Sequence, residues 1–274
     1  MTSRQRRRIL CALAATALVL GGCSAPRAPG SYRIDDSMSA RGKASRVEII
    51  VLHYTASSKT GALATLTNRD VSAHYVVSDD SPPVVYRLVG EDLAAWHAGE
   101  SNWYGRSYIN PRSIGIEIVH PGWNTSNAPG PDFPPDQIDV VIALTRDVAR
   151  RHGVSPENIV GHSDVAPGRK QDPGPAFPWR QLALAGVGRW FDERAAPAYE
   201  TRFEQEGVPK PKWFQDQLRR VGYAVPDTGQ LDAGTRQALT AFQLHYRPSL
   251  VTGLPDAQTA ARLLATPTTG SAIP

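Results

Sequence analysis

Two apolar runs rich in β-branched residues constrain the fold most strongly. Residues 46–54 read RVEIIVLHY, and residues 113–120 read SIGIEIVH. Short apolar runs of this composition predict buried strands, because β-branched side chains pack well on a pleated surface. Each run carries a residue capable of acid–base or metal chemistry, His53 in the first and Glu117 in the second. We therefore expect a sheet whose buried strands carry reactive side chains.

Further strands and helices alternate with these two runs. The clearest helix is 135–152, where apolar residues recur every three or four positions after Pro134 and Pro135, and Gly153 follows as a stop signal. Further strands are expected at 73–80, 83–89 and 158–161, and further helices at 61–70 and 179–190. Strands interleaved with helices predict an α/β domain over residues 46–192, in which helices cover a mixed β-sheet.

The chain changes character after this domain. Residues 193–209 are charged and irregular, and we expect a linker or a set of turns there. Residues 210–265 predict three short helices with Leu, Phe or Val at helical spacing, enough for a small second domain with a three-helix core. Residues 266–274 are rich in Thr, Pro, Gly and Ser, and we expect a disordered tail.

The N-terminus has the pattern of an export signal. Four arginines within residues 4–8 precede an apolar stretch from Ile9 to Leu20. Twelve residues rise only about 18 Å as a helix, well short of the roughly 30 Å hydrocarbon core of a bilayer. Residues 1–22 therefore predict a secretory leader rather than a membrane span.

The end of the leader carries a cysteine. Residues 20–23 read LGGC and resemble the lipobox of bacterial lipoproteins, which implies lipidation of Cys23. By the same resemblance, Ser24 favours an exported lipoprotein in the outer membrane, facing the periplasm; the alternative is a plain cleaved signal. Residues 23–45 have the composition of a flexible tether. Cys11 lies in the leader, so the mature chain keeps one cysteine and no intramolecular disulfide is possible.

The charge of the chain argues against nucleic acid as a partner. The leader arginines account for the whole formal net charge of +4, and no Lys/Arg-rich face stands out elsewhere. Nucleic-acid binding depends on a concentrated positive surface, so we expect no nucleic-acid partner.

A third segment adds His162 and Asp172 to the reactive residues, in the sequence GHSDVAPGRKQDPG. Two imidazoles and a carboxylate are the usual protein ligands of a catalytic zinc, which lowers the pKa of water to about 7. The pattern therefore favours hydrolysis. Taken singly, each histidine could be a packed or surface residue, and Glu117 could be a solvated residue of a half-exposed strand.

Five segments in order carry a family resemblance. They lie between Val47 and Trp190 and read VLHYTAS, SAHYVV, AWHAG, NPRSIGIEIV and GHSDVAPGRKQDPG. They resemble the type 2 N-acetylmuramoyl-L-alanine amidases, whose fold is shared by phage-lysozyme-type amidases and peptidoglycan recognition proteins. The resemblance implies the following site residues: His53, His162 and Asp172 as zinc ligands, Glu117 as general base, Lys170 as the group that stabilises the oxyanion, and Trp96 and His97 as substrate contacts. For His97, structural packing is the alternative.

The C-terminal segment resembles the peptidoglycan-binding domain type 1 family; a purely structural appendage is the alternative. The matching positions are Gln217, Leu218, Gly222, Tyr223, Gly229, Asp232, Thr235, Ala238, Phe242, Gln243 and Gly253. The two resemblances together imply hydrolysis of the amide between N-acetylmuramic acid and L-alanine by a zinc enzyme, and we expect this enzyme to be a monomer. The implied partners are peptidoglycan, muropeptides and, through the lipid anchor, a membrane.

Two other functions compete with this interpretation. Peptidoglycan recognition proteins of this fold that lack metal ligands only bind, whereas the three ligands and Glu117 are all present in this chain. A metallopeptidase cutting within the stem peptide could use similar ligands, but the chain contains no HExxH motif.

Overall fold

The computed structural model describes residues 32–123 and 130–268. Contacts divide the chain into two units at residues 43 and 44. Residues 32–43 are exposed and contain no helix or strand. The predicted leader, Cys23 and the first part of the predicted tether lie outside the described residues. No helix within the described ranges is long and apolar enough to cross a membrane.

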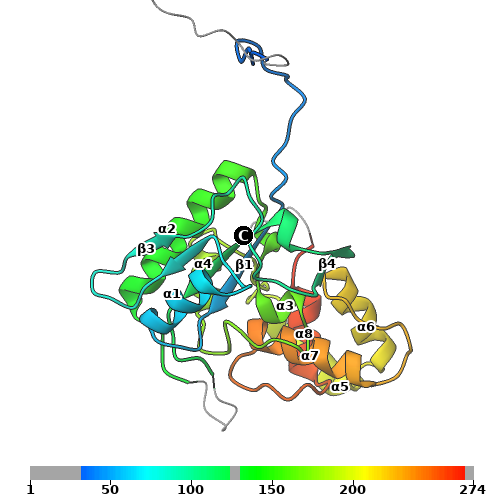
Figure 1. Ribbon diagram of the computed structural model, residues 1–274. Helices are drawn as coiled ribbons and strands as arrows, with labels where there is room; N and C mark the ends of the chain where they lie inside the picture. Colours follow the sequence, from blue (N-terminus) through cyan, green and yellow to red (C-terminus); the bar gives the residue numbers. More distant parts are fainter. Residues whose placement is uncertain (1–31, 124–129, 269–274) are drawn as a thin grey trace, which may run out of the picture. The chain divides into compact units, whose positions relative to one another are not determined.

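A five-stranded mixed sheet lies at the centre of the second unit (Figure 1). Its strands are β1 (Ile49–Tyr54), β2 (Tyr75–Val77), β3 (Val85–Arg87), β6 (Ser113–Ile118) and β7 (Ile159–Gly161). They lie in the order β3-β2-β6-β1-β7, with only β3 antiparallel to its neighbour. The two apolar runs of the sequence form β1 and β6, the two central and almost wholly buried strands. The predicted mixed sheet is confirmed.

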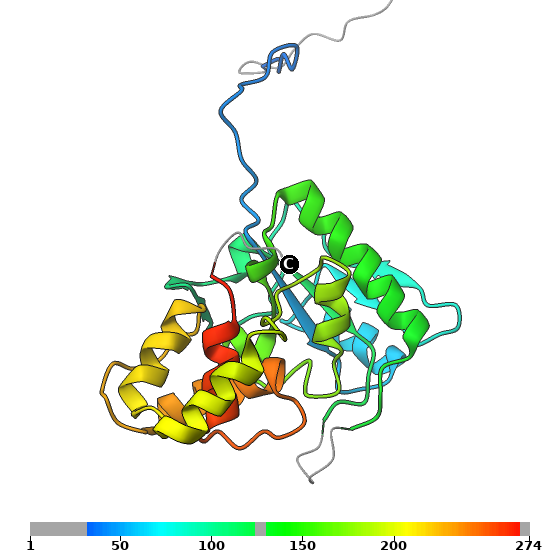
Figure 2. The ribbon, with the colours of Figure 1, turned by 180° about the vertical axis from the view of Figure 1, so that it is seen from behind.

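Helices cover the sheet on both faces (Figures 1 and 2). On one face lies α1 (Lys59–Asn68), and on the other lie α2 (Pro135–His152) and α4 (Trp179–Leu184). The bounds of α2 agree with the sequence prediction, and α2 ends at Gly153, whose φ of 71° suits glycine. The expected helix at 179–190 is shorter in the structure, because Gly186 and Gly188 both adopt positive φ just after it.

Parallel pairing brings reactive side chains to one edge of the sheet. His53 in β1 pairs in register with Glu117 in β6, so the two side chains lie next to each other on one face. On the other side of β1, β7 ends at Gly161, and His162 follows at once as the first residue of the short helix α3 (His162–Val165). Ligands of open α/β sheets usually bind at this carboxyl edge of the strands.

Four further helices follow the sheet: α5 (Ala196–Glu206), α6 (Pro211–Arg220), α7 (Ala233–Tyr246) and α8 (Ala257–Ala265). The last three correspond to the three expected helices. α5 corrects the prediction of a linker at 193–209. Its core-facing side chains are Ala196, Tyr199 and Phe203, at helical spacing, within an otherwise charged and polar segment. The predicted disordered tail is also corrected at its start, because Thr266 is buried and its carbonyl oxygen accepts a hydrogen bond from Arg220.

The C-terminal helices share a continuous core with the sheet domain. The smaller elements are a hairpin of β4 (Asn102–Trp103) and β5 (Arg106–Ser107) and two 3-10 helices, η1 (Asn110–Arg112) and η2 (Pro156–Asn158). Trp103 of the hairpin packs edge-on against Tyr223, with ring centroids 5.2 Å apart. The next residue, Tyr104, donates its backbone N–H to the carbonyl oxygen of Gly222 at 2.9 Å.

Candidate metal centre

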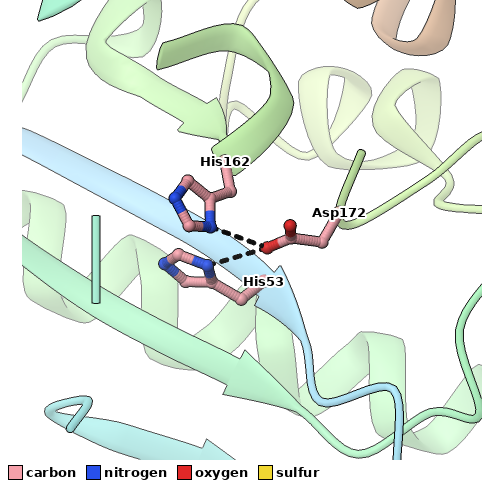
Figure 3. A group of neighbouring side chains, drawn as sticks. All are labelled: His53, His162 and Asp172. Atoms are coloured by element: carbon pink, nitrogen blue, oxygen red, sulfur yellow. Dashed lines mark hydrogen bonds and ion pairs between the residues drawn. The ribbon is translucent and has the colours of Figure 1, made fainter. Parts of the chain in front are cut away.

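Three buried side chains from distant parts of the sequence converge at the carboxyl edge of the sheet (Figure 3). His53 comes from β1, His162 from the start of α3, and Asp172 from the loop that follows. Oδ2 of Asp172 lies 2.8 Å from Nδ1 of His53 and 3.1 Å from Nδ1 of His162. The three candidate ligand atoms lie within 4.8 Å of one another, and they form the one such group found in residues 32–123 and 130–268.

The imidazole of His162 is oriented by a contact at Nε2, the ring nitrogen that points away from Asp172. Nε2 lies 3.1 Å from the carbonyl oxygen of Ala98, which can only accept a hydrogen bond. When the proton is on Nε2 and is donated to this carbonyl, Nδ1 has a lone pair directed at Asp172. Nη2 of Arg169 lies 3.3 Å from the same Nε2 and also donates to the carbonyl oxygen of Ala98. Histidines that bind metals usually donate their second ring N–H in this way.

A chain of hydrogen bonds orients His53 in the same sense. The hydroxyl of Ser113 donates to the carbonyl oxygen of Ile109 at 2.8 Å, so the hydroxyl oxygen accepts from Nε2 of His97 at 3.1 Å. Nδ1 of His97 then accepts a hydrogen bond from Nε2 of His53 at 3.1 Å. In this arrangement of the protons, which is the one that a bound metal requires, Nδ1 of His53 has a lone pair on the side of Asp172.

These hydrogen-bond directions create a site for a cation. Burial, and then the neighbouring His162, lower the pKa of His53 to about 4, so the ring is neutral at neutral pH. Burial disfavours the charged form of Asp172, but its contacts with His162 and His53 outweigh burial and keep the pKa of the carboxyl below its usual range. In the structure Oδ2 of Asp172 accepts a hydrogen bond from each imidazole. With each ring proton on Nε2 instead, two Nδ1 lone pairs and the carboxylate oxygen would be available to a cation. Two nitrogens and one oxygen suit Zn²⁺.

A cavity of about 340 Å³ opens beside this His-His-Asp cluster. It is lined by residues of α1, by Trp96 and His97, and by Glu117 and Lys170, together with two residues of the cluster. All site residues predicted within the described chain, except His53, therefore line the same cavity.

Glu117 is an acid with one enclosed oxygen. Oε2 of Glu117 is buried and has no hydrogen-bond partner among the described residues. Burial, and then the charge of Asp172, raise the pKa of Glu117 well above its usual value, while Lys170 acts in the opposite direction. A carboxyl group whose pKa lies closer to neutrality can both accept and release a proton at working pH. Glu117 faces the cavity and is not a solvated residue on the outside of the sheet.

The other predicted site residues differ in what they contact. The ring of Trp96 is largely exposed at the cavity. Lys170 is also exposed there, whereas the neighbouring Arg169 donates to the carbonyl oxygen of Glu100 at 2.6 Å. His97 has both ring nitrogens engaged in the hydrogen-bond chain, so its geometry favours orienting His53 over contacting a substrate.

Two residues that support the site are not singled out by the sequence. Oδ1 of Asn110 accepts the backbone N–H groups of His97 at 3.2 Å and Ala98 at 2.8 Å. Ser113 ends the chain that orients His53. Both stand in the segment NPRSIGIEIV. The signal in the sequence was a polar residue three positions before a buried strand, Asn110, and a polar first residue of that strand, Ser113.

The fold and the site together define a class of protein: a hydrolytic α/β enzyme with a side-chain cluster suited to a metal ion. The family model for N-acetylmuramoyl-L-alanine amidase matches residues 43–175, and that for a putative peptidoglycan binding domain matches residues 208–263. The chain is 39% identical over 263 residues to the N-acetylmuramoyl-L-alanine amidase AmiD of Escherichia coli (strain K12), covering 91% of this chain and 94% of that protein. The chain belongs to the N-acetylmuramoyl-L-alanine amidase family.

Solved structures agree over both the sheet domain and the C-terminal helices. The crystal structure of AmpDh3 from Pseudomonas aeruginosa matches with a TM-score of 0.79 at 36% identity, over 86% of this chain and 97% of that chain. The complex of E. coli AmiD with the substrate anhydro-N-acetylmuramic acid-L-Ala-D-gamma-Glu-L-Lys matches with a TM-score of 0.74 at 38% identity, over 85% of this chain and 93% of that chain. The predicted family, fold class and enzyme class are confirmed, while the domain bounds and individual site roles stay predictions.

Proposed function

We propose that this amidase uses zinc to hydrolyse the amide between the lactyl group of N-acetylmuramic acid and the L-alanine of the stem peptide, in peptidoglycan or muropeptides. The observation that carries the proposal is the convergence of the two imidazoles of His53 and His162 and the Asp172 carboxylate beside Glu117 at one cavity. A muropeptide as the ligand is supported by the substrate in the E. coli AmiD complex.

Zinc would be held by His53, His162 and Asp172. When bound, it supplies Lewis acidity, which polarises the scissile carbonyl and acidifies water. With the metal bound, Nε2 of His162 would donate to the carbonyl of Ala98 and Nε2 of His53 to the ring of His97, which leaves the two Nδ1 lone pairs for the metal. The chain thereby presents its ligands in the deprotonated form that metal binding requires.

The side chains around the cluster supply the proton transfers and the remaining charge. Glu117 takes a proton from the attacking water and delivers it to the leaving amine nitrogen, because its enclosed carboxyl has a raised pKa. Lys170 brings positive charge to the developing oxyanion. Trp96 offers an exposed ring for apolar contact with the substrate.

Product analysis tests the proposed bond. Intact peptidoglycan treated with the enzyme is expected to release peptides that begin with L-alanine, as identified by mass spectrometry. A chelator should abolish the release, and added Zn²⁺ should restore it, because the ligand atoms hold the metal reversibly. Peptides cut internally would instead support a stem-peptide metallopeptidase, and binding without release would support a recognition protein.

The N-terminal pattern supports a lipid anchor at Cys23 and a location at the outer membrane, facing the periplasm. The tether that follows would let an anchored enzyme reach the wall. The family match over residues 208–263 supports peptidoglycan binding by the C-terminal helices. We propose that the protein is a monomer.

Replacing Cys23 by serine tests the anchor. The Cys23→Ser variant is expected to leave the membrane fraction, because stable attachment requires the acyl chains carried by that cysteine. Fractionation and immunoblotting measure the shift, with Cys11→Ser as the matched control because Cys11 lies in the leader. An unchanged membrane fraction for Cys23→Ser would remove the anchor from the proposal.

A further inference from the structure

Asp164 lies two residues after His162 and is fully buried, held by residues of the C-terminal helical part. Its Oδ1 accepts a hydrogen bond from the hydroxyl of Tyr223 at 2.5 Å, and its Oδ2 accepts one from Nδ1 of His245 at 2.8 Å. Oδ2 also accepts the backbone N–H of Gly161 at 2.7 Å. One carboxylate therefore connects the backbone just before His162 to α7 and to the turn after α6.

His245 supports the same backbone through a second contact. Its ring stacks on the indole of Trp179, with centroids 3.9 Å apart and planes 14° apart. A β-carbon at Gly161 would lie 3.2 Å from that indole and 2.7 Å from Cδ of Pro173, so the three groups are tightly packed. Pro173 directly follows Asp172. His245 thus lies behind the segments that carry two of the three cluster residues.

The helix α3 transmits these contacts to the cluster. All four of its residues are buried, so it has little freedom to shift. The backbone N–H of Ser163 donates to the carbonyl oxygen of Asp172 at 2.9 Å, which links the backbones of the two segments directly. The position of α3 therefore sets how His162 faces Asp172.

We propose that Tyr223 and His245 are positioning residues of the amidase site: through Asp164 they hold α3, and so they set the orientation of His162 and the affinity for zinc. The inference rests on the proposed function, because it takes His162 as a zinc ligand. On this inference the C-terminal helices help to build the catalytic site, in addition to any role in binding peptidoglycan.

The affinity for Zn²⁺, measured by competition with a chromophoric chelator, tests this inference without any hydrolysis. Tyr223→Phe keeps the ring but removes the hydroxyl, and its Kd for Zn²⁺ is expected to rise about tenfold, at the lower end of the range for outer partners of metal ligands. His245→Phe should act similarly, since it keeps a ring against Trp179 but has no donor. His245→Asn places an amide N–H near the position of Nδ1 and should restore most of the affinity.

Tyr246→Phe is the matched control. Tyr246 is as deeply buried as Tyr223, and its ring stacks on His245. Its hydroxyl accepts from Nε of Arg189, whereas among the described residues it is Tyr223 whose hydroxyl donates to Asp164 of α3. Thermal unfolding should show similar losses for the two variants, while only Tyr223→Phe loses zinc affinity. Equal Kd values for wild type, Tyr223→Phe and Tyr246→Phe would overturn the inference and leave the proposed function intact. A wild-type chain that binds zinc but releases no L-alanine peptides would defeat the proposed function, and the Kd comparison would still decide the inference.

Discussion

The His162→Ala variant is expected to lose both zinc and wall hydrolysis. Removal of this imidazole deletes one of the three converging ligand atoms and opens the site on the side of Ala98. The loss should exceed the about 10- to 100-fold typical of changes to residues behind a metal ligand. Metal content by elemental analysis and release of L-alanine peptides from peptidoglycan measure the two effects.

A second histidine provides the control. His152 lies at the end of α2, where its Nε2 contacts Glu91 at 2.8 Å and its Nδ1 contacts Ser45 at 2.7 Å. His152→Ala should therefore keep zinc and activity at nearly wild-type levels. Full hydrolytic activity in His162→Ala, under conditions where wild type depends on metal, would refute the proposed ligand set.

The Glu117→Gln variant is expected to keep zinc but to lose turnover by about 10²- to 10⁴-fold, the usual contribution of a general acid–base group. Glutamine has nearly the same shape as glutamate, so the cavity is preserved, but its amide cannot accept and release the proton. Steady-state kinetics on a muropeptide should show the change in kcat, and elemental analysis should show an unchanged zinc content.

A second carboxylate, Glu91, provides a control that separates an effect on catalysis from an effect on stability. Glu91 accepts a hydrogen bond from the hydroxyl of Tyr75 at 2.6 Å and pairs with Arg151 and His152. Glu91→Gln should lower the unfolding temperature and leave kcat unchanged. A normal kcat in Glu117→Gln would exclude Glu117 as the base, whatever the result for Glu91→Gln.

The strands and the long helix could be predicted because their signals are local. The β-branched runs around His53 and Glu117 and the pattern from Pro135 to Gly153 each identify one element without reference to the rest of the chain. α5 was missed because only three of its side chains, Ala196, Tyr199 and Phe203, face the core, while the others are charged or polar like those of a linker. Its helical state depends on packing against distant residues rather than on its own pattern.

The sequence could predict which side chains belong to the site, but not what each side chain contacts. Trp96 and His97 are neighbours in the sequence, yet Trp96 is exposed at the cavity while His97 accepts a hydrogen bond from His53. No spacing rule distinguishes these environments, because they depend on which element packs beside each ring. The same holds for Asp164, a plain acidic residue in the sequence that becomes a buried link to Tyr223 in the fold.

The sequence alone determined which chemical groups this amidase has available and the order of its strands and helices along the chain, because residue identity, periodicity and turn residues are local properties. Only the tertiary structure decided that His53, His162 and Asp172 meet, which imidazole nitrogens face the carboxylate, and that the C-terminal helices support the same site. These outcomes depend on strand register and long-range packing. The contacts between residues 119 and 81 positions apart, His53 with Asp172 and Asp164 with His245, exist only once the sheet and the helices have assembled.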